Sequence, residues 1–255
     1  MQNSQCQSCK NPGPEMDIVM AFQPIVDLEA GKVWGYEALV RGAAGESAGA
    51  VLAQVTEENR YTFDQTCRVK AIETAGRLFD DESLKLSINF MPNAVYQPAA
   101  CIRTSLAAAQ KVGLSRDRLM FEFTEQERVV DVAHVSHIIE SYKQFGFITA
   151  VDDFGAGYAG LNLLAELRPD ILKIDMELIR GIDVDQRRQV IVSGVCAVAN
   201  ALDITVLAEG IETDAEARTL RGMGLSLMQG YLFARPEIQR LPPVTLSSPK
   251  LAAVA

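Results

Sequence analysis

The chain has 255 residues, 48% of them hydrophobic and 22% charged, and its formal net charge at pH 7 is −9. This length and apolar content are enough for one large core, and α/β barrels of this size commonly form a single domain. An acidic chain does not offer the basic surface that neutralises duplex phosphates, so a duplex nucleic-acid partner is not expected. A ligand that carries phosphate would have to be attracted by something else, such as bound metal ions.

The sequence shows neither a membrane-spanning segment nor an export signal. No apolar run approaches the roughly 20 residues that a membrane span requires, and residues 1–15 lack the basic start and apolar stretch of a signal peptide. The five cysteines are an odd number, and Cys67, Cys101 and Cys196 lie in apolar or helical surroundings. Free thiols in a reducing compartment fit this pattern, so we expect a cytoplasmic protein without a membrane span.

The chain divides into a central domain and two weakly patterned ends. Residues 1–16 are expected to form a flexible leader, residues 17–240 one catalytic domain, and residues 241–255 a loose C-terminal tail. The central part contains short apolar runs rich in strand-forming residues. In chain order these predicted strands cover residues 18–26, 32–40, 84–90, 119–124, 147–153, 171–175, 204–210 and 225–233.

The connections between the predicted strands indicate how they are arranged. The first two are joined by DLEAGK, which is too short for a crossover helix, so these two strands should pair antiparallel. Later strands are separated by stretches with helical spacing, such as residues 51–79 and 187–202. Strand–helix alternation favours a parallel sheet. Eight strands in a chain of this length predict a (β/α)8-like TIM barrel with the first strand antiparallel to the rest.

Polar residues interrupt the apolar strands from the second onward. Taken singly, each is more often a solvated side chain or a turn former than a functional residue. A buried carboxylate is costly unless it is paired or binds a metal, and seven consecutive strands each carry a polar residue, mostly toward the carboxyl end where barrel enzymes build active sites. These residues are Glu37, Asn89, Glu122, Asp152 with Asp153, Lys173, Glu209 and Gln229.

Five carboxylates at one barrel mouth would repel each other strongly without cations. Oxygen ligands without His or Cys among them favour hard ions, so we expect Mg²⁺ or Mn²⁺. Two such ions can activate a water and stabilise both oxygens of an in-line phosphoryl displacement. Calcium prefers longer bonds and higher coordination numbers, so it is expected to inhibit.

These residues lie within motifs that resemble the EAL family of cyclic di-GMP phosphodiesterases, over about Ala21 to Pro236. The motifs follow one another in the order of the family, and seven of them in that order make a specific signal. They are Phe22-Gln23-Pro24-Ile25 with Tyr36-Glu37-Ala38-Leu39-Val40-Arg41, Ser87-Ile88-Asn89, Phe121-Glu122-Phe123-Thr124-Glu125, Asp152-Asp153-Phe154-Gly155, Leu172-Lys173-Ile174-Asp175, Ala208-Glu209-Gly210-Ile211-Glu212 and Gln229-Gly230-Tyr231.

The resemblance implies a role for each matching residue. Glu37, Asn89, Glu122 and Asp152 resemble the ligands of one metal ion, and Asp152 with Asp153 the support of the second. Lys173 resembles the lysine that orients or deprotonates the attacking water. Glu209 and Gln229 resemble the residues that hold that water, and Glu125 the residue that anchors the loop after Asp153. Catalytic roles are thereby expected for Lys173, Glu209 and Glu125, and substrate binding for Gln23, Leu39, Arg41, Gln229 and Pro236.

The resemblance also implies cyclic di-GMP as the ligand, linear 5'-pGpG as the product and a homodimer as the assembly, with a sensor or regulatory protein acting in trans as a further partner. The family loop usually has Thr at the position of Ala156 and Ser at those of Ala159 and Gly160. These departures affect the positioning of the loop and its link to the dimer rather than the ligands.

Two other functions stay open at this point. Some members of the family have lost activity and serve as cyclic di-GMP receptors or protein-interaction modules, usually after losing a metal ligand or the base. Every such position is filled here, which favours catalysis. A barrel hydrolase acting on a different phosphodiester is the second alternative, because guanine specificity rests on the resemblance.

Overall fold

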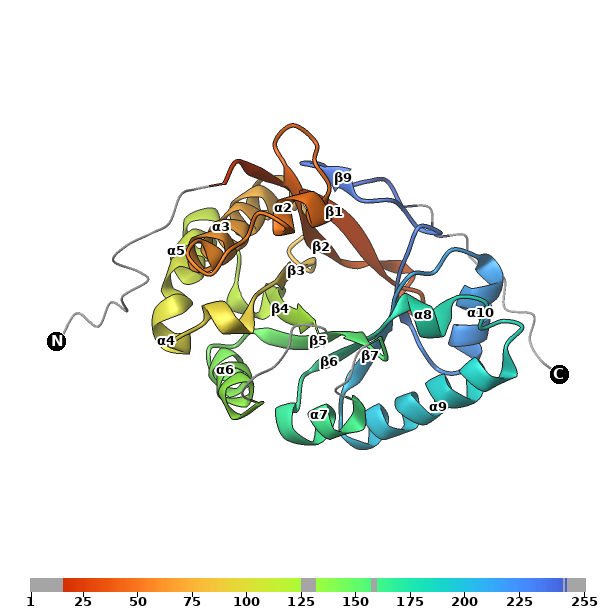
Figure 1. The fold of residues 1–255 in the computed structure, drawn as a ribbon. Coiled ribbons are helices and arrows are strands. Elements are labelled where there is room, and N and C mark those ends of the chain that lie inside the picture. The colour runs from red at the N-terminus through yellow and green to blue at the C-terminus, as the bar shows by residue number, and fades with distance from the viewer. Residues whose placement is uncertain (1–15, 125–131, 157–159, 245, 247–255) are drawn as a thin grey trace.

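The computed structural model describes residues 16–124, 132–156, 160–244 and 246. Its centre is a closed barrel of eight strands with a ninth, short strand at its edge (Figure 1). The expected barrel is therefore confirmed, and the two-residue ninth strand was not predicted. The strands are β1 (Ile18–Asp27), β2 (Lys32–Gly42), β3 (Lys85–Asn89), β4 (Leu119–Thr124), β5 (Ile148–Phe154), β6 (Ile171–Ile174), β7 (Thr205–Ala208), β8 (Leu227–Gln229) and β9 (Glu237–Ile238).

β1 closes the barrel and runs against its neighbours. It pairs antiparallel with β2 on one side and with β8 on the other, while β2 to β8 follow one another in parallel. The turn between β1 and β2 is fixed by Asp27, whose carboxylate accepts the backbone N–H groups of Glu29 and Ala30. Gly31 supplies the positive φ of 64° that completes the reversal. The short DLEAGK link thus forms the antiparallel hairpin that its length predicts.

Helices surround the barrel (Figure 1). The stretch 51–79, which has helical spacing throughout, is broken in the structure between α2 and α3. Asn59 causes the break, because its side chain accepts the N–H of Thr56 and donates to the carbonyl of Gln54, replacing helical bonds. The helices are α2 (Ala48–Leu52), α3 (Arg60–Leu78), α4 (Pro98–Cys101), α5 (Arg103–Val112), α6 (Val132–Gln144), α7 (Gly160–Leu167), α8 (Met176–Ile179), α9 (Gln186–Ala201) and α10 (Asp214–Gly222).

The hydrophobic core has two main parts. The larger cluster joins the outward faces of the strands to the helices and includes Phe90, Phe121 and Tyr142. A smaller cluster draws one residue from each of six strands. Five of its members precede a polar candidate residue by two positions, which places them on the same face of the strand. The six are Ile25, Met120, Ala150, Ile171, Leu207 and Leu227.

The structure describes the two expected end segments of the chain only in part. Residues 1–15 of the expected leader, and residues 245 and 247–255 of the expected tail, lie outside the described part of the chain. Within it, Leu241, Val244 and Leu246 pack against the larger cluster. Among the helices of the described ranges, none is long and apolar enough to cross a membrane.

Candidate active site

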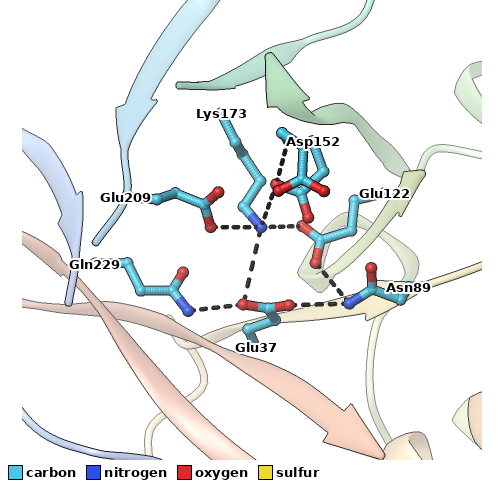
Figure 2. Close-up of polar contacts among 8 residues, drawn as sticks. Glu37, Asn89, Glu122, Asp152, Lys173, Glu209 and Gln229 are labelled. Atoms are coloured by element: carbon cyan, nitrogen blue, oxygen red, sulfur yellow. Dashed lines mark hydrogen bonds and ion pairs between the residues drawn. The ribbon is translucent and has the colours of Figure 1, made fainter. Parts of the chain in front are cut away.

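The polar residues predicted from the sequence point toward one another inside the barrel (Figure 2). They lie next to the smaller apolar cluster along their strands. Asn89 and Gln229 end β3 and β8, Glu209 directly follows β7, and the others lie within their strands. Because alternate residues share a face, Met120 lies under Glu122, Ala150 under Asp152 and so on around the barrel. The apolar layer closes the floor of the site and removes water from beneath the charges.

Lys173 occupies the centre of this group. Its side chain is fully buried, and its Nζ lies 2.9 Å from Glu209 Oε1, 3.0 Å from Asp152 Oδ1 and 3.1 Å from Glu122 Oε2. Glu37 Oε2 is more distant, at 3.8 Å. One ammonium thus faces four carboxyl groups, which it cannot neutralise alone when all four are ionised.

Two amide side chains complete the ring. Asn89 Nδ2 donates to Glu37 Oε1 at 2.9 Å and to Glu122 Oε1 at 3.0 Å, and Gln229 Nε2 donates to Glu37 Oε2 at 2.7 Å (Figure 2). The other atom of the second amide, Gln229 Oε1, is buried and has no hydrogen-bond partner among the described residues. An amide offers an oxygen acceptor as well as its N–H donors, so both residues are able to bind a cation or a water.

Asp152 and Asp153 approach the same site although they are consecutive in a strand. Neighbouring side chains normally point to opposite faces. Here the pairing of β5 with β6 shifts between Val151 and Phe154, and Asp153 has a φ of 56°. Its backbone N–H donates to Asp152 Oδ1 at 2.9 Å. This irregularity, like a β-bulge, re-aims a side chain at the end of a strand.

The carboxylates form two groups that share a member. One oxygen from each of Glu37, Glu122 and Asp152 lies within 4.8 Å of the others, and the same holds for Asp152, Asp153 and Glu209. Both groups offer oxygen donors, which suit Mg²⁺ and Mn²⁺. The residues present therefore fit divalent cations, and Asp152 belongs to both groups.

The electrostatics of the site follow from burial and crowding. Burial raises the pKa of Glu122 and of Glu209 well above the usual range, and neighbouring carboxylates add to the rise while Lys173 opposes it. Burial, with the charges of Asp152 and Asp175, raises the pKa of Asp153 to about 6. Burial alone would lower the pKa of Lys173, but the surrounding carboxylates outweigh it and raise that pKa well above its ordinary value. The ammonium is therefore charged in this arrangement.

The expected substrate-binding residues lie around the rim of this cluster. Gln23 is buried and pairs with Glu37 across β1 and β2. Leu39 and Arg41 continue the face of Glu37 toward the carboxyl end of β2, and Arg41 donates to the carbonyl of its neighbour Val40. Pro236 is half-buried and directly precedes β9, whose Glu237 pairs with Phe22 beside Gln23.

Glu125 and Asp175 differ from the acidic residues around Lys173. Glu125, expected to be catalytic, lies outside the described residues, as does part of the loop that follows Asp153. Asp175 received no role from the sequence, yet it is buried, and its side chain hydrogen-bonds with Asp153. Its spacing of two residues from Lys173 is the signal that could have indicated it.

Comparisons with known proteins agree with this geometry. The family model described as "EAL domain" matches residues 15–236. A standalone versatile EAL protein from Vibrio cholerae O395, solved in a c-di-GMP bound form, is 52% identical and superimposes with a TM-score of 0.87, covering 91% of this chain and 98% of that chain. Klebsiella pneumoniae BlrP1, solved as a calcium/cy-diGMP complex, is 33% identical with a TM-score of 0.84, covering 91% of this chain and 60% of the other. A manganese/cy-diGMP complex of BlrP1 is also similar, at 34% identity and a TM-score of 0.82, covering 89% of this chain and 58% of the other.

Curated relatives are longer proteins. The blue light- and temperature-regulated antirepressor BluF of Escherichia coli K12 is 29% identical over 91% of this chain and 57% of its own length. The cyclic di-GMP phosphodiesterase NbdA of Pseudomonas aeruginosa is 30% identical over 84% of this chain and 28% of its own length. The chain thus spans a quarter to somewhat more than half of these relatives.

Proposed function

Since this chain belongs to the EAL domain family, we propose that it is a cyclic-guanylate-specific phosphodiesterase, which hydrolyses cyclic di-GMP to linear 5'-pGpG in bacterial second-messenger signalling. The observation that carries this proposal is the convergence of four carboxylates on buried Lys173, with Asp152 shared between two groups of oxygen donors. Relatives named as cyclic di-GMP phosphodiesterases and similar structures with bound c-di-GMP support the choice of substrate.

The two groups of carboxylates suggest which residues hold each ion. Glu37, Glu122 and Asp152, with the amide of Asn89, would hold one, and Asp152 with Asp153 would support the second. When bound, two divalent ions lower the pKa of a water and stabilise the attacking and leaving oxygens of a phosphodiester. The calcium and manganese complexes of BlrP1 support a divalent metal.

The remaining polar residues would act on the attacking water. Lys173 and Glu209, 2.9 Å apart, would orient it, and Gln229 offers its unpartnered oxygen as an acceptor. A role for Lys173 as base requires that cations neutralise the carboxylates that now raise its pKa. Glu125 is proposed to anchor the loop after Asp153 on the basis of its motif.

The rim residues would bind the nucleotide. Arg41 carries a planar fork of donors suited to a phosphate oxygen pair, and it is half-buried on the same strand face as Glu37, toward the carboxyl end of β2. Gln23, Leu39 and Pro236 line the same side of the barrel mouth around β1 and β2.

The assembly proposed is a symmetric homodimer whose interface includes α9. Support comes from α9, where large apolar side chains are exposed at helical spacing. Val190 is 67% exposed, Ile191 50%, Val198 37% and Leu202 49%. Contiguous apolar surface of this kind is typical of an interface. A sensor or regulatory protein acting in trans could control the same face.

The alternative is a regulator that uses the domain to bind the nucleotide or a partner protein. The similarity to an antirepressor, BluF, favours it. The complete set of carboxylates around Lys173 argues for catalysis, because a receptor has no need to keep four buried acidic side chains together.

Incubation of the purified protein with cyclic di-GMP and Mg²⁺ or Mn²⁺, followed by chromatography, tests the proposal. Linear pGpG should accumulate with either ion and not in chelator, and calcium should leave the cyclic nucleotide intact because it would not hold a water in the geometry for attack. Nucleotide that binds but stays intact with both Mg²⁺ and Mn²⁺ would establish the receptor function instead.

A further inference from the structure

A buried ion pair lies outside the catalytic cluster, in the layer between α3 and the barrel. Asp64 and Arg68 are one helical turn apart, and Arg68 Nη2 lies 2.8 Å from Asp64 Oδ2. Their side chains are 1% and 0% exposed. Replacing a buried pair by apolar residues is often neutral or stabilising, so stability alone does not account for two such charges. Their other contacts indicate what they do.

Asp64 holds the backbone just beyond the end of β3. The N–H of Met91 donates to Asp64 Oδ1 at 2.9 Å. One residue earlier, the N–H of Phe90 donates to the carbonyl of Glu122 at 2.9 Å. The chain that leaves Asn89 is therefore fixed at two successive amides, one bonded to a neighbouring strand and the other to Asp64.

Arg68 lies against the residues next to two candidate metal ligands. Its guanidinium carbon is 5.2 Å from the ring centroid of Phe90 and 5.5 Å from that of Phe121, and its Nη1 donates to the Tyr142 hydroxyl at 2.7 Å. Side chains alternate along a strand, so Phe90 and Phe121 face the helices while Asn89 and Glu122 face the interior. The ion pair thus supports these two residues from behind.

We propose that Asp64 is a positioning residue for metal binding, which fixes Asn89 by holding the Met91 amide. This inference rests on the proposed function for the role of Asn89. Asn89 reaches both Glu37 and Glu122 through a single amide nitrogen, at 2.9 and 3.0 Å. A small movement of the end of β3 would therefore separate it from both carboxylates at once. Groups that orient metal ligands in this way typically change metal affinity or activity by about 10–100-fold when they are removed.

Two double variants separate the bond to Met91 from the charge of the pair. Asp64→Leu with Arg68→Met removes the charges and the acceptor of the Met91 N–H. Asp64→Asn with Arg68→Met also removes the charges but keeps an amide oxygen that can accept that N–H. Ile72→Ala on the same helix, at a fully buried position in the larger cluster, controls for a general loss of packing. Met91→Pro, which removes the donor itself, replaces the leucine variant should that protein not fold.

Each folded variant is titrated with Mn²⁺ in two ways, by direct binding and by the concentration that gives half-maximal hydrolysis. We expect the leucine variant to need at least tenfold more Mn²⁺ in both titrations, with the asparagine variant and Ile72→Ala within about twofold of the unchanged protein. Equal shifts in the two double variants, or wild-type titrations in both, would overturn the proposal. If the unchanged protein binds Mn²⁺ but does not hydrolyse cyclic di-GMP, the proposed function fails, while direct binding still decides the role of Asp64.

Discussion

At the scale of single residues, the charge balance around Lys173 decides the chemistry. One buried ammonium cannot neutralise four carboxylates that lie 2.9 to 3.8 Å from it. Divalent cations would supply the missing positive charge. They would also lower the pKa of Lys173 toward neutral pH, where a neutral amine can act as a base. Metal binding and activation of the lysine would therefore be linked in the proposed mechanism.

Replacement of Glu37 by Ala should lower hydrolysis by about 100-fold or more, because it removes a carboxylate from the group that also contains Glu122 and Asp152. The barrel should stay folded, since the change relieves repulsion between carboxylates. Turnover at saturating Mg²⁺ and circular dichroism measure the two effects. Glu29→Ala, in the exposed turn between β1 and β2, is the control. Wild-type turnover in the Glu37 variant would disprove its role as a ligand.

The raised pKa of Asp153 predicts a pH dependence of stability in chelator. The pKa rises from 3.8 in an exposed carboxyl to about 6 in the folded protein. Asp153 thus holds its proton more tightly in the folded state than in the unfolded chain. As the pH rises from 3.8 to about 6, the carboxyl group becomes charged and the folded state is destabilised. Asp153→Asn should therefore stabilise the metal-free protein at pH 7 and hardly at pH 4. One pKa unit is worth about 1.4 kcal/mol, and a half-exposed group is partly screened by water, so we expect ~1–2 kcal/mol.

Urea unfolding of both proteins in chelator, at the two pH values, measures this difference. Asn tolerates a positive φ nearly as well as Asp does, so the backbone at φ 56° is not an added source of strain. A stabilisation of equal size at pH 4 and pH 7 would show that protonation of Asp153 is not its cause.

At the scale of elements, Glu216 joins two loops at the mouth of the barrel. Its carboxylate accepts the N–H groups of Glu212 and Thr213, and also that of Gly181 in the turn after α8. Thr213 in turn accepts the N–H of Glu216, which completes a capping box at the start of α10. The segment that follows Glu209 is thereby fixed to the segment that follows Lys173.

Glu216→Gln should lower the free energy of unfolding at pH 7 by about 1–3 kcal/mol, because an amide offers one acceptor oxygen in place of two. Although burial acts in the opposite direction, the three backbone N–H groups lower the pKa of Glu216 below 4.5. This carboxylate stabilises the folded state fully above its pKa in the unfolded chain. The stabilisation is lost as the pH falls through its lower pKa in the folded protein. The difference between the two proteins should therefore narrow at pH 3 in urea titrations.

Glu212→Gln serves as the matched control. Its carboxylate pairs with Arg180 at 2.7 Å, and both side chains are about half exposed. An exposed pair contributes about 0–1 kcal/mol. A loss as large in this variant as in the Glu216 variant would show that local charge, rather than the bonds to backbone amides, stabilises this region.

The elements also show what the sequence could predict. Each of the eight barrel strands was predicted because a buried strand is a short, almost continuous apolar run, and the polar residues were found because they interrupt such runs. The break between α2 and α3 was missed, since Asn59 ends the helical pattern through two side-chain bonds rather than through Pro or Gly. Asp152 and Asp153 both approach one site because the pairing of β5 with β6 shifts its register. The regular alternation of side chains along a strand does not predict such a shift.

At the scale of the whole molecule, the closed barrel and its eight strands follow from the sequence, whereas the support behind the site does not. Asp64 and Arg68 lie in the stretch 51–79, whose helical spacing does not mark either residue as buried. Their burial appears only when α3 packs beside β3 and β4 and meets Phe90 and Tyr142. Contacts between residues far apart in sequence therefore had to come from the structure.

The exposed apolar face of α9 predicts how the assembly responds to a charge. Val190→Glu places a carboxylate where the proposed partner subunit would exclude water, so the dimer should weaken at least tenfold. Light scattering coupled to size exclusion measures the mass over a range of concentrations. Leu52→Glu on α2, at a side chain that is 44% exposed, is the control and should leave the mass unchanged. A monomeric unchanged protein, or a Val190 variant that dimerises normally, would contradict the proposed interface.

The reversed direction of β1 determines the end of the barrel at which the chain arrives. Ile18 pairs with Gly42, beyond Glu37 toward the carboxyl end of β2, so β1 begins at the end of the barrel that carries the candidate active site. If β1 were parallel to the other strands, it would instead begin at the opposite end of the barrel, below the apolar layer. β9 leaves on the side of the candidate site too, because Ile238 pairs with Ala21. A fluorophore attached at Asp17 would therefore lie at the end of the barrel that carries the candidate active site, whereas one at Glu29 would lie at the opposite end. A protein domain fused ahead of β1 would likewise lie at the end that carries the candidate site.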